Sequence, residues 1–136
     1  MILKTKQNPD SLFEHFVSNW FELIASGKWE EAFAQIDLSA SYGEPYTPAR
    51  FKDEIENDHF CEGTIFRNEN PKISYSNPKK MEGSGNPNIY PLDGTSNFSF
   101  EYDVPLNNEF SDLTSGWEFI DAGEFYKVRL EFLHVL

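Results

Sequence analysis

The stretch TSNFSFEYDVPLNNEFSDLTSGWEFIDAGEFYKVRLEFLHVL, residues 95–136, decides the fold. Its first part alternates strictly, because every even position from Phe98 to Leu106 is apolar and the odd positions carry polar residues or proline. Successive side chains of a strand point to opposite faces. A period of two therefore predicts a strand that is buried on one face only.

The end of the chain repeats this alternation. One parity of the last segment holds Tyr126, Val128, Leu130, Phe132, His134 and Leu136. Lys127, Arg129 and Glu131 lie on the other parity, until Leu133 and Val135 break the rule. Residues 113–121 form a shorter candidate strand between the two, and the turn at residues 121–123 contains a glycine, as tight hairpins prefer. The C-terminal third thus predicts three antiparallel strands with one apolar face that must be covered.

The N-terminal part predicts the helices that cover this face. Apolar residues recur at intervals of three and four from Leu12 to Ile24, after a cap at Asn8 or Asp10 and before Gly27. A second helix is expected from residue 28 or 29 to 36, and a third over residues 48–59. Short strands are expected at 63–67 and 72–76, and a long irregular loop at 76–96. The expected fold is one α+β domain over residues 1–136, with three N-terminal helices packed on a curved, cone-like antiparallel sheet.

Composition narrows the class of protein. A chain of 136 residues can bury one core without disulfides, and its single cysteine, Cys61, suits a reducing compartment. No apolar segment follows the N-terminal lysines, and no apolar run approaches the roughly 20 residues of a membrane span. We therefore expect a cytoplasmic protein, as a monomer or a homodimer.

The charge is the most informative feature of the composition. Eleven basic residues stand against twenty-three acidic ones, which gives a net charge of −12. Such a field repels nucleic acid and anionic membranes, and it attracts basic proteins over a Debye length of about 8 Å. The plain alternative is that the acidic surface serves solubility alone.

The expected third helix carries the densest group of acidic residues. The candidate partner-binding residues are Asp53, Glu54, Glu56, Asp58 and Glu62. Only Lys52 offsets them, so this segment is either a solvated helix face or a docking surface for a basic protein.

The segment LIASGKWEEAF, residues 23–33, together with the order of helices and strands, resembles the nuclear-transport-factor-2-like superfamily. The resemblance implies a cone fold that hosts isomerases, dehydratases, hydrolases, protein-binding modules and bacterial toxin-immunity proteins. The tail, with SDLT at 111–114 and LHVL at 133–136, resembles small uncharacterised bacterial proteins. Because the superfamily is so diverse, the fold does not determine the function.

Enzymes of that superfamily place an acid or a histidine in the mouth of the cone. The candidate pocket residues here are His134, Tyr126, Tyr102, Trp117 and Trp20. A deep pocket in which His134 meets a buried carboxylate or tyrosine would favour an enzyme. A cone filled by Trp20, Phe21, Phe100 and Trp117 would exclude that role.

Other catalytic and metal sites are not expected. His59 and Cys61 look like metal ligands beside Asp58 and Glu62, but neighbouring residues cannot all converge on one ion, and the paired spacing of zinc sites is missing. No nucleophile motif or phosphate-binding loop occurs, so we expect neither metal nor cofactor. The leading hypothesis is a non-catalytic acidic binding protein, most concretely a bacterial immunity-type inhibitor of a basic toxin. The alternative is a small-ligand-binding or isomerase- or dehydratase-like protein that uses the cone pocket, and a dimer without a ligand is a third.

Overall fold

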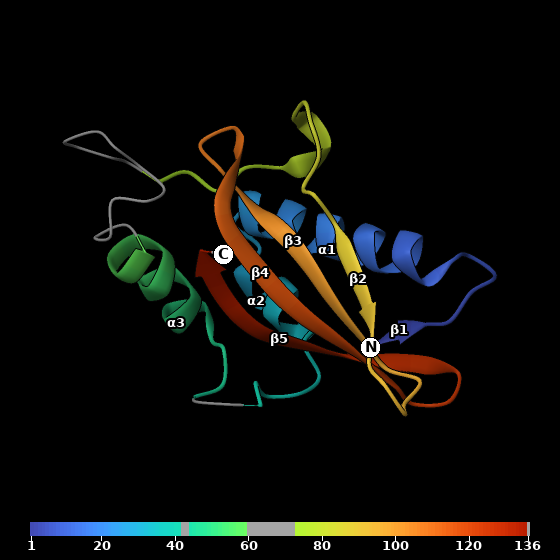
Figure 1. Ribbon diagram of the computed structural model, residues 1–136. Helices are drawn as coiled ribbons and strands as arrows, with labels where there is room; N and C mark the ends of the chain where they lie inside the picture. Colours follow the sequence, from blue (N-terminus) through green and yellow to red (C-terminus); the bar gives the residue numbers. More distant parts are fainter. Residues whose placement is uncertain (42–43, 60–72, 136) are drawn as a thin grey trace.

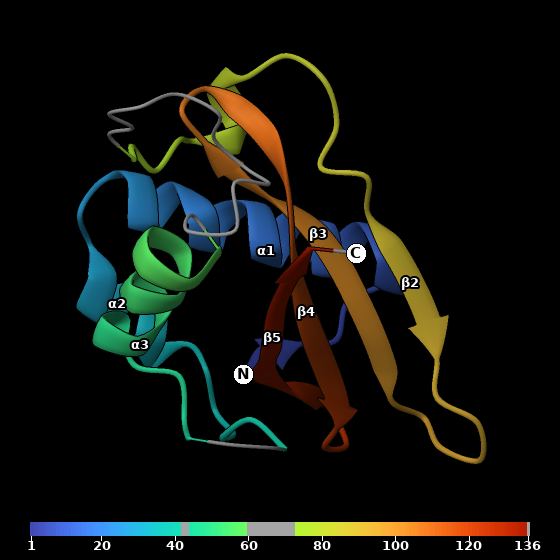
Figure 2. The same cartoon turned by 60° about the vertical axis from the view of Figure 1, so that its left-hand side comes forward.

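The computed structural model describes residues 1–41, 44–59 and 73–135, and it contains a five-stranded antiparallel sheet in the order β1-β5-β4-β3-β2 (Figure 1). The strands are β1 (Ile2–Leu3), β2 (Asn88–Pro91), β3 (Phe98–Leu106), β4 (Glu109–Asp121) and β5 (Phe125–Val135). The α-helices are α1 (Pro9–Ala25), α2 (Trp29–Ala34) and α3 (Pro48–Asp53). The helices lie on one side of the curved, open sheet (Figure 2), which confirms the predicted α+β class.

Strands β3 and β5 lie where the alternation predicts them, whereas β4 begins at Glu109 rather than at the expected residue 113. Gly123 adopts a φ of +85° in the turn between β4 and β5, a conformation that favours glycine. Strand β2 was not expected, because it lies within the segment 76–96 that reads as a loop, and β1 is too short to leave a pattern. The strand expected at 72–76 is wrong, since Tyr75 makes only an isolated bridge to Leu106, and the one expected at 63–67 lies outside the described residues.

The helices follow their caps and apolar stripes. Pro9 begins α1, and the helix ends two residues before Gly27, whose φ is +76°. The Oγ1 atom of Thr47 accepts a hydrogen bond of 3.1 Å from the Arg50 amide and so caps α3. The third helix then continues to residue 59 as predicted, but its second half is the π-helical turn η1 (Glu54–His59).

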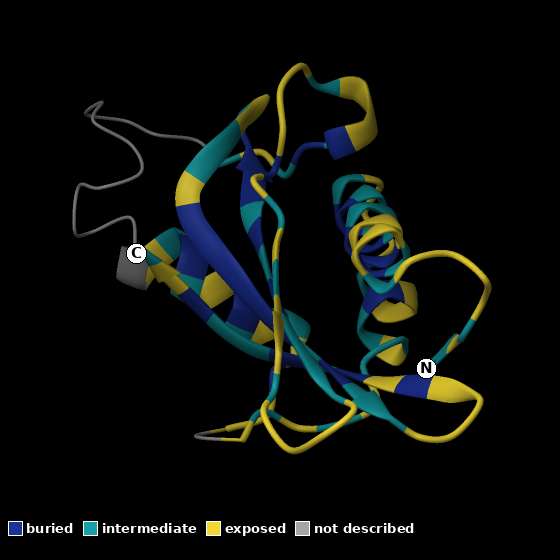
Figure 3. Ribbon diagram, turned by 45° about the vertical axis from the view of Figure 1, so that its right-hand side comes forward, coloured by how far each residue is buried: buried dark blue, intermediate teal, exposed yellow. Residues whose placement is uncertain are grey.

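Aromatic rings from α1 and the sheet fill the interior. The Phe13 and Phe119 rings stack at 3.9 Å between centroids, and the Trp20 and Trp117 rings meet edge to face at 5.0 Å. The Trp20 indole also donates a hydrogen bond of 2.8 Å to the Ala32 carbonyl, which ties α1 to α2. Buried residues are concentrated in α1 and in the long strands across from it, whereas the hairpin loops are exposed (Figure 3).

A β-bulge in β5 reverses the faces at the end of the chain. Trp117 pairs with Leu130, but Gly116 pairs with Phe132, so Glu131 is the extra residue. A slip of one residue exchanges the two faces of a strand. Leu133 is therefore buried and His134 exposed, so the expectation that His134 lies on the apolar face is wrong. The break in alternation at Leu133 was the signal of this bulge.

Gly116 makes room for Phe132 beside the bulge. A Cβ atom at position 116 would overlap the Phe132 ring, which itself stacks on His134 at 4.6 Å between centroids. We expect Gly116→Ala to lower the free energy of unfolding by about 1–3 kcal/mol, as overpacking does elsewhere. Urea denaturation measures this loss.

A double-variant cycle isolates the cause of that loss. In a Phe132→Ala background the added methyl group has no ring to displace, so the cost of Gly116→Ala should fall by at least half. An equal cost in both backgrounds would show that Phe132 does not limit position 116.

Candidate functional site

The acidic helix was the partner-binding surface expected from the sequence, and the structure holds two of its carboxylates in place. Glu54 lies 3.1 Å from Arg50 Nε and accepts a hydrogen bond of 3.1 Å from the Tyr46 hydroxyl. Glu56 accepts one of 3.1 Å from the Tyr75 hydroxyl. Asp53 is exposed, and the Asn57 side chain donates to it at 2.5 Å. The side chain of Asp58 and the whole of Glu62 lie outside the described residues.

The two tyrosines remain hydrogen-bond donors. Burial, followed by the nearby charge of Glu54, raises the pKa of Tyr46 well above its ordinary value. Burial and Glu56 do the same to the pKa of Tyr75. The Arg50 guanidinium also lies over the Tyr46 ring, 3.8 Å from its centroid. Glu54 and Glu56 are therefore fixed in orientation at the surface of the third helix.

The candidate residues of the cone pocket do not line one cavity. Trp20, Trp117, Tyr102 and Tyr126 are buried, and the two tryptophans have no exposed surface. Phe21 and Phe100 are buried beside them, so the cone is filled by the four side chains whose packing was expected to exclude a pocket. His134 lies on the opposite face of the sheet, where no described carboxylate or tyrosine bonds to it.

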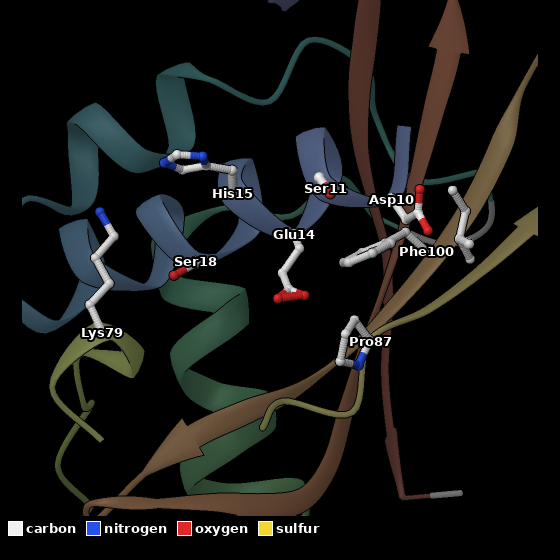
Figure 4. A pocket seen from close by; sticks show the side chains of 9 residues that line it. Asp10, Ser11, Glu14, His15, Ser18, Lys79, Pro87 and Phe100 are labelled. Atoms are coloured by element: carbon white, nitrogen blue, oxygen red, sulfur yellow. The ribbon is translucent and has the colours of Figure 1, made fainter. Parts of the chain in front are cut away.

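A groove of about 450 Å³ lies between α1 and the edge of the sheet (Figure 4). It is lined by Asp10, Ser11, Glu14, His15, Ser18, Lys79, Pro87, Ile89 and Phe100. Figure 4 shows the Glu14 carboxylate extending from α1 toward Pro87. This groove is not evident from the sequence. Its only local signal is the pair of acidic residues at positions 10 and 14, one helical turn apart.

The polar groups of the groove are unevenly paired. Lys79 Nζ lies 3.1 Å from Glu22 Oε1 and also donates to Asn19. Hydrogen bonds from Lys79 and then from Asn77 hold the pKa of Glu22 below its ordinary value. Behind the groove, burial and then the charge of Glu14 raise the pKa of Tyr102 to about 12, while a hydrogen bond to Ser18 acts the other way. Glu14 therefore sits close to a buried hydroxyl that stays protonated.

A third polar cluster lies on β4 and β5, on the face turned away from the helices. The Arg129 guanidinium lies 3.1 Å from Glu118 and 3.8 Å from Glu131. Burial raises the pKa of Glu118 most, followed by the hydrogen bond that its protonated carboxyl donates to Glu131 and by the negative charge of Glu131. Ser41 Oγ donates to Glu131 at 2.8 Å, and Arg129 donates to Ser41 at 3.1 Å. This cluster fastens the segment after α2 to β5, so its role is structural.

The described part of the chain shows neither a cluster of metal-ligating side chains nor a membrane-spanning helix. It contains no group of three or more His, Cys, Asp or Glu side chains that could hold a metal ion. His59, Cys61 and Glu62 lie at or beyond the edge of that part, so the expectation about them stays a prediction. Across residues 1–41, 44–59 and 73–135, none of the helices is long and apolar enough to cross a bilayer.

No family model, curated protein or solved structure matches the chain.

Proposed function

We propose that the protein is a non-catalytic acidic binding protein whose partner is a basic protein. The most concrete form of this proposal is an immunity-type inhibitor of a basic bacterial toxin in the cytoplasm. The net charge of −12 carries the proposal, because it favours fast association with a cationic surface. The packed interior supports it further, because Trp20, Trp117 and the tyrosines of the candidate pocket are buried, whereas His134 is exposed on the other face of the sheet.

We propose the third helix as the docking surface for this partner. The structure describes the side chains of three candidate contact residues, Asp53, Glu54 and Glu56. Asp58 and Glu62 are the other two candidates. Two of its carboxylates are oriented by tyrosine hydroxyls and need little further ordering when a partner binds. Binding is stronger when groups are held in place beforehand, because less conformational entropy is lost. The same bonds reduce the charge that is free to face outward, which leaves Asp53 as the most available carboxylate of the three.

We also propose that the chain is a member of the nuclear-transport-factor-2-like superfamily. A long first helix, two shorter helices and a curved antiparallel sheet support this assignment. It is compatible with the proposed function, because that superfamily includes protein-binding and immunity proteins. A solved structure of the chain that superimposes on a cone protein along all three long strands would test it.

Charge reversal at Asp53 tests the docking surface. We expect Asp53→Lys to slow association with the basic protein about tenfold at low salt, and the effect should shrink at moderate salt because exposed charges are screened. Stopped-flow mixing with the purified partner measures the rate. Asp93→Lys is the matched control, since Asp93 is equally charged and exposed but lies in the turn between β2 and β3.

Isosteric variants remove the charge of a carboxylate with little change in its shape. Glu54→Lys would break the contacts with Arg50 and Tyr46, so Glu54→Gln is the safer change. Glu56→Gln is the corresponding change at Glu56. If Asp53→Lys and Asp93→Lys slow association equally, only the total charge matters and the third helix is not the docking surface.

A further inference from the structure

The groove between α1 and the sheet edge carries two carboxylates on a single wall. Asp10 and Glu14 lie one helical turn apart on α1, both are exposed, and neither has an ion pair with any residue in the described part of the chain. Like charges at this spacing repel each other and destabilise a helix. A cation bound between them would remove that repulsion.

The opposite wall of the groove is apolar. Pro87 and Ile89 lie there beside the Phe100 ring, on β2 and on the chain that leads into it. Figure 4 shows Pro87 facing the Glu14 carboxylate across the groove. The groove therefore pairs an acidic wall with an apolar one, within a volume of about 450 Å³.

The lysine at the end of the groove does not neutralise the acidic wall. Lys79 Nζ contacts Glu22 and Asn19, on the next turns of α1, rather than Asp10 or Glu14. Ser11 and Ser18 add hydroxyl groups beside the two carboxylates. The groove therefore has more hydrogen-bond acceptors than cationic groups to pair with them.

We propose that this groove binds the side chain of an arginine from a basic protein segment. The guanidinium head would lie between Asp10 and Glu14, and its aliphatic stem would lie along Pro87 and Ile89. A guanidinium presents five donors in a fixed plane and is weakly hydrated, so it suits a site with several acceptors and an apolar wall better than an ammonium does. The inference extends the proposed function, because the arginine belongs to the basic partner, but the groove can be tested without that partner.

The test is an NMR titration of the ¹⁵N-labelled chain with N-acetyl-arginine amide, a probe whose only charge is the guanidinium. We expect saturable shifts of amides in residues 10–18 and 87–89, with millimolar affinity that weakens as salt is added. N-acetyl-norleucine amide, which has a stem of similar length and no charge, should bind at least fivefold more weakly. N-acetyl-lysine amide should fall between the two.

Matched variants locate the carboxylates that matter. Glu14→Gln and Asp10→Asn should each weaken binding of the arginine probe at least fivefold. Glu30→Gln and Glu31→Gln remove the same charge from exposed positions on α2 and should leave the affinity unchanged. Melting curves of all four variants check that each is folded. Glu14→Gln should melt no lower than the native chain because it removes a repulsion, whereas Asp10→Asn also removes an acidic group from the first turn of α1.

Three results would overturn the inference. They are shifts spread over the acidic surface without saturation, equal binding of the norleucine probe, or equal affinities in Glu14→Gln and Glu30→Gln.

The proposed function fails separately: if the probe binds as expected but no basic protein associates with the chain, the groove stands and the protein-partner proposal falls. If a basic partner binds Glu14→Gln as tightly as the native chain, its arginine does not use the groove and the inference falls, whereas the docking surface on the third helix is unaffected.

Discussion

Replacing Trp20 by alanine is expected to lower the free energy of unfolding by about 3–5 kcal/mol, the range for truncating a buried aromatic side chain. Its ring has no exposed surface and contacts rings from α2, α3 and the sheet, with centroid distances of 5.3 Å to Phe33, 5.4 Å to Phe51 and 5.0 Å to Trp117. One side chain therefore joins all three α-helices to the sheet. Urea denaturation followed by circular dichroism measures the loss.

Two controls show where the loss comes from. Trp20→Phe keeps an aromatic ring but loses the hydrogen bond to the Ala32 carbonyl, so it should cost about 1–3 kcal/mol. Trp29→Ala removes a half-buried ring and should cost less than Trp20→Ala. A smaller loss for Trp20→Ala than for Trp29→Ala would contradict the packing described for the cone.

Replacing Arg129 by methionine is expected to cost about 1–3 kcal/mol at pH 7, because it leaves Glu118 and Glu131 close together without a cation. Methionine keeps most of the length of the stem, so the change removes mainly charge. The double variant Arg129→Met, Glu118→Gln should recover part of the loss, since it removes one of the two like charges. Chemical denaturation of the three chains provides the comparison.

The loss caused by Arg129→Met should also depend on pH. The pKa of Glu118 is already raised in the folded chain, mainly by burial and Glu131, and Arg129 opposes that rise. Without Arg129 the folded carboxyl binds its proton more tightly than the unfolded one does, so stability falls as pH rises through its folded pKa. The deficit should be largest at pH 7 and shrink toward pH 5. A deficit that grows as pH falls would contradict this account.

The strands were predictable because their pattern is local. Alternation from Phe98 to Leu106 is decided by neighbours in the sequence, and burial follows it up to Val104, beyond which Pro105 is buried as well. The bulge at Glu131 was not predicted, although the apolar Leu133 and Val135 marked it, because its position depends on the fit of Phe132 over Gly116 on another strand. Strand β2 was missed because its four residues hold little apolar pattern and gain their order from pairing with β3.

The candidate sites were less predictable than the fold. The acidic residues of the third helix are evident in the sequence, but their partners come from elsewhere: Tyr46 precedes the helix, and Tyr75 lies 19 residues after Glu56. The groove combines residues of α1 with Pro87 and Ile89, and only the folded sheet brings them together. The sequence shows which residues are charged, but the fold decides which of them stay unpaired.

Capture from a lysate of the cells that express the chain tests the central claim most directly. The native chain and the Asp53→Lys and Asp93→Lys variants are immobilised, and proteins bound at low and at moderate salt are identified by mass spectrometry. We expect a single basic protein that binds the native chain and Asp93→Lys, binds Asp53→Lys weakly, and is released by moderate salt. No basic protein at either salt, or equal capture by all three chains, would contradict the claim.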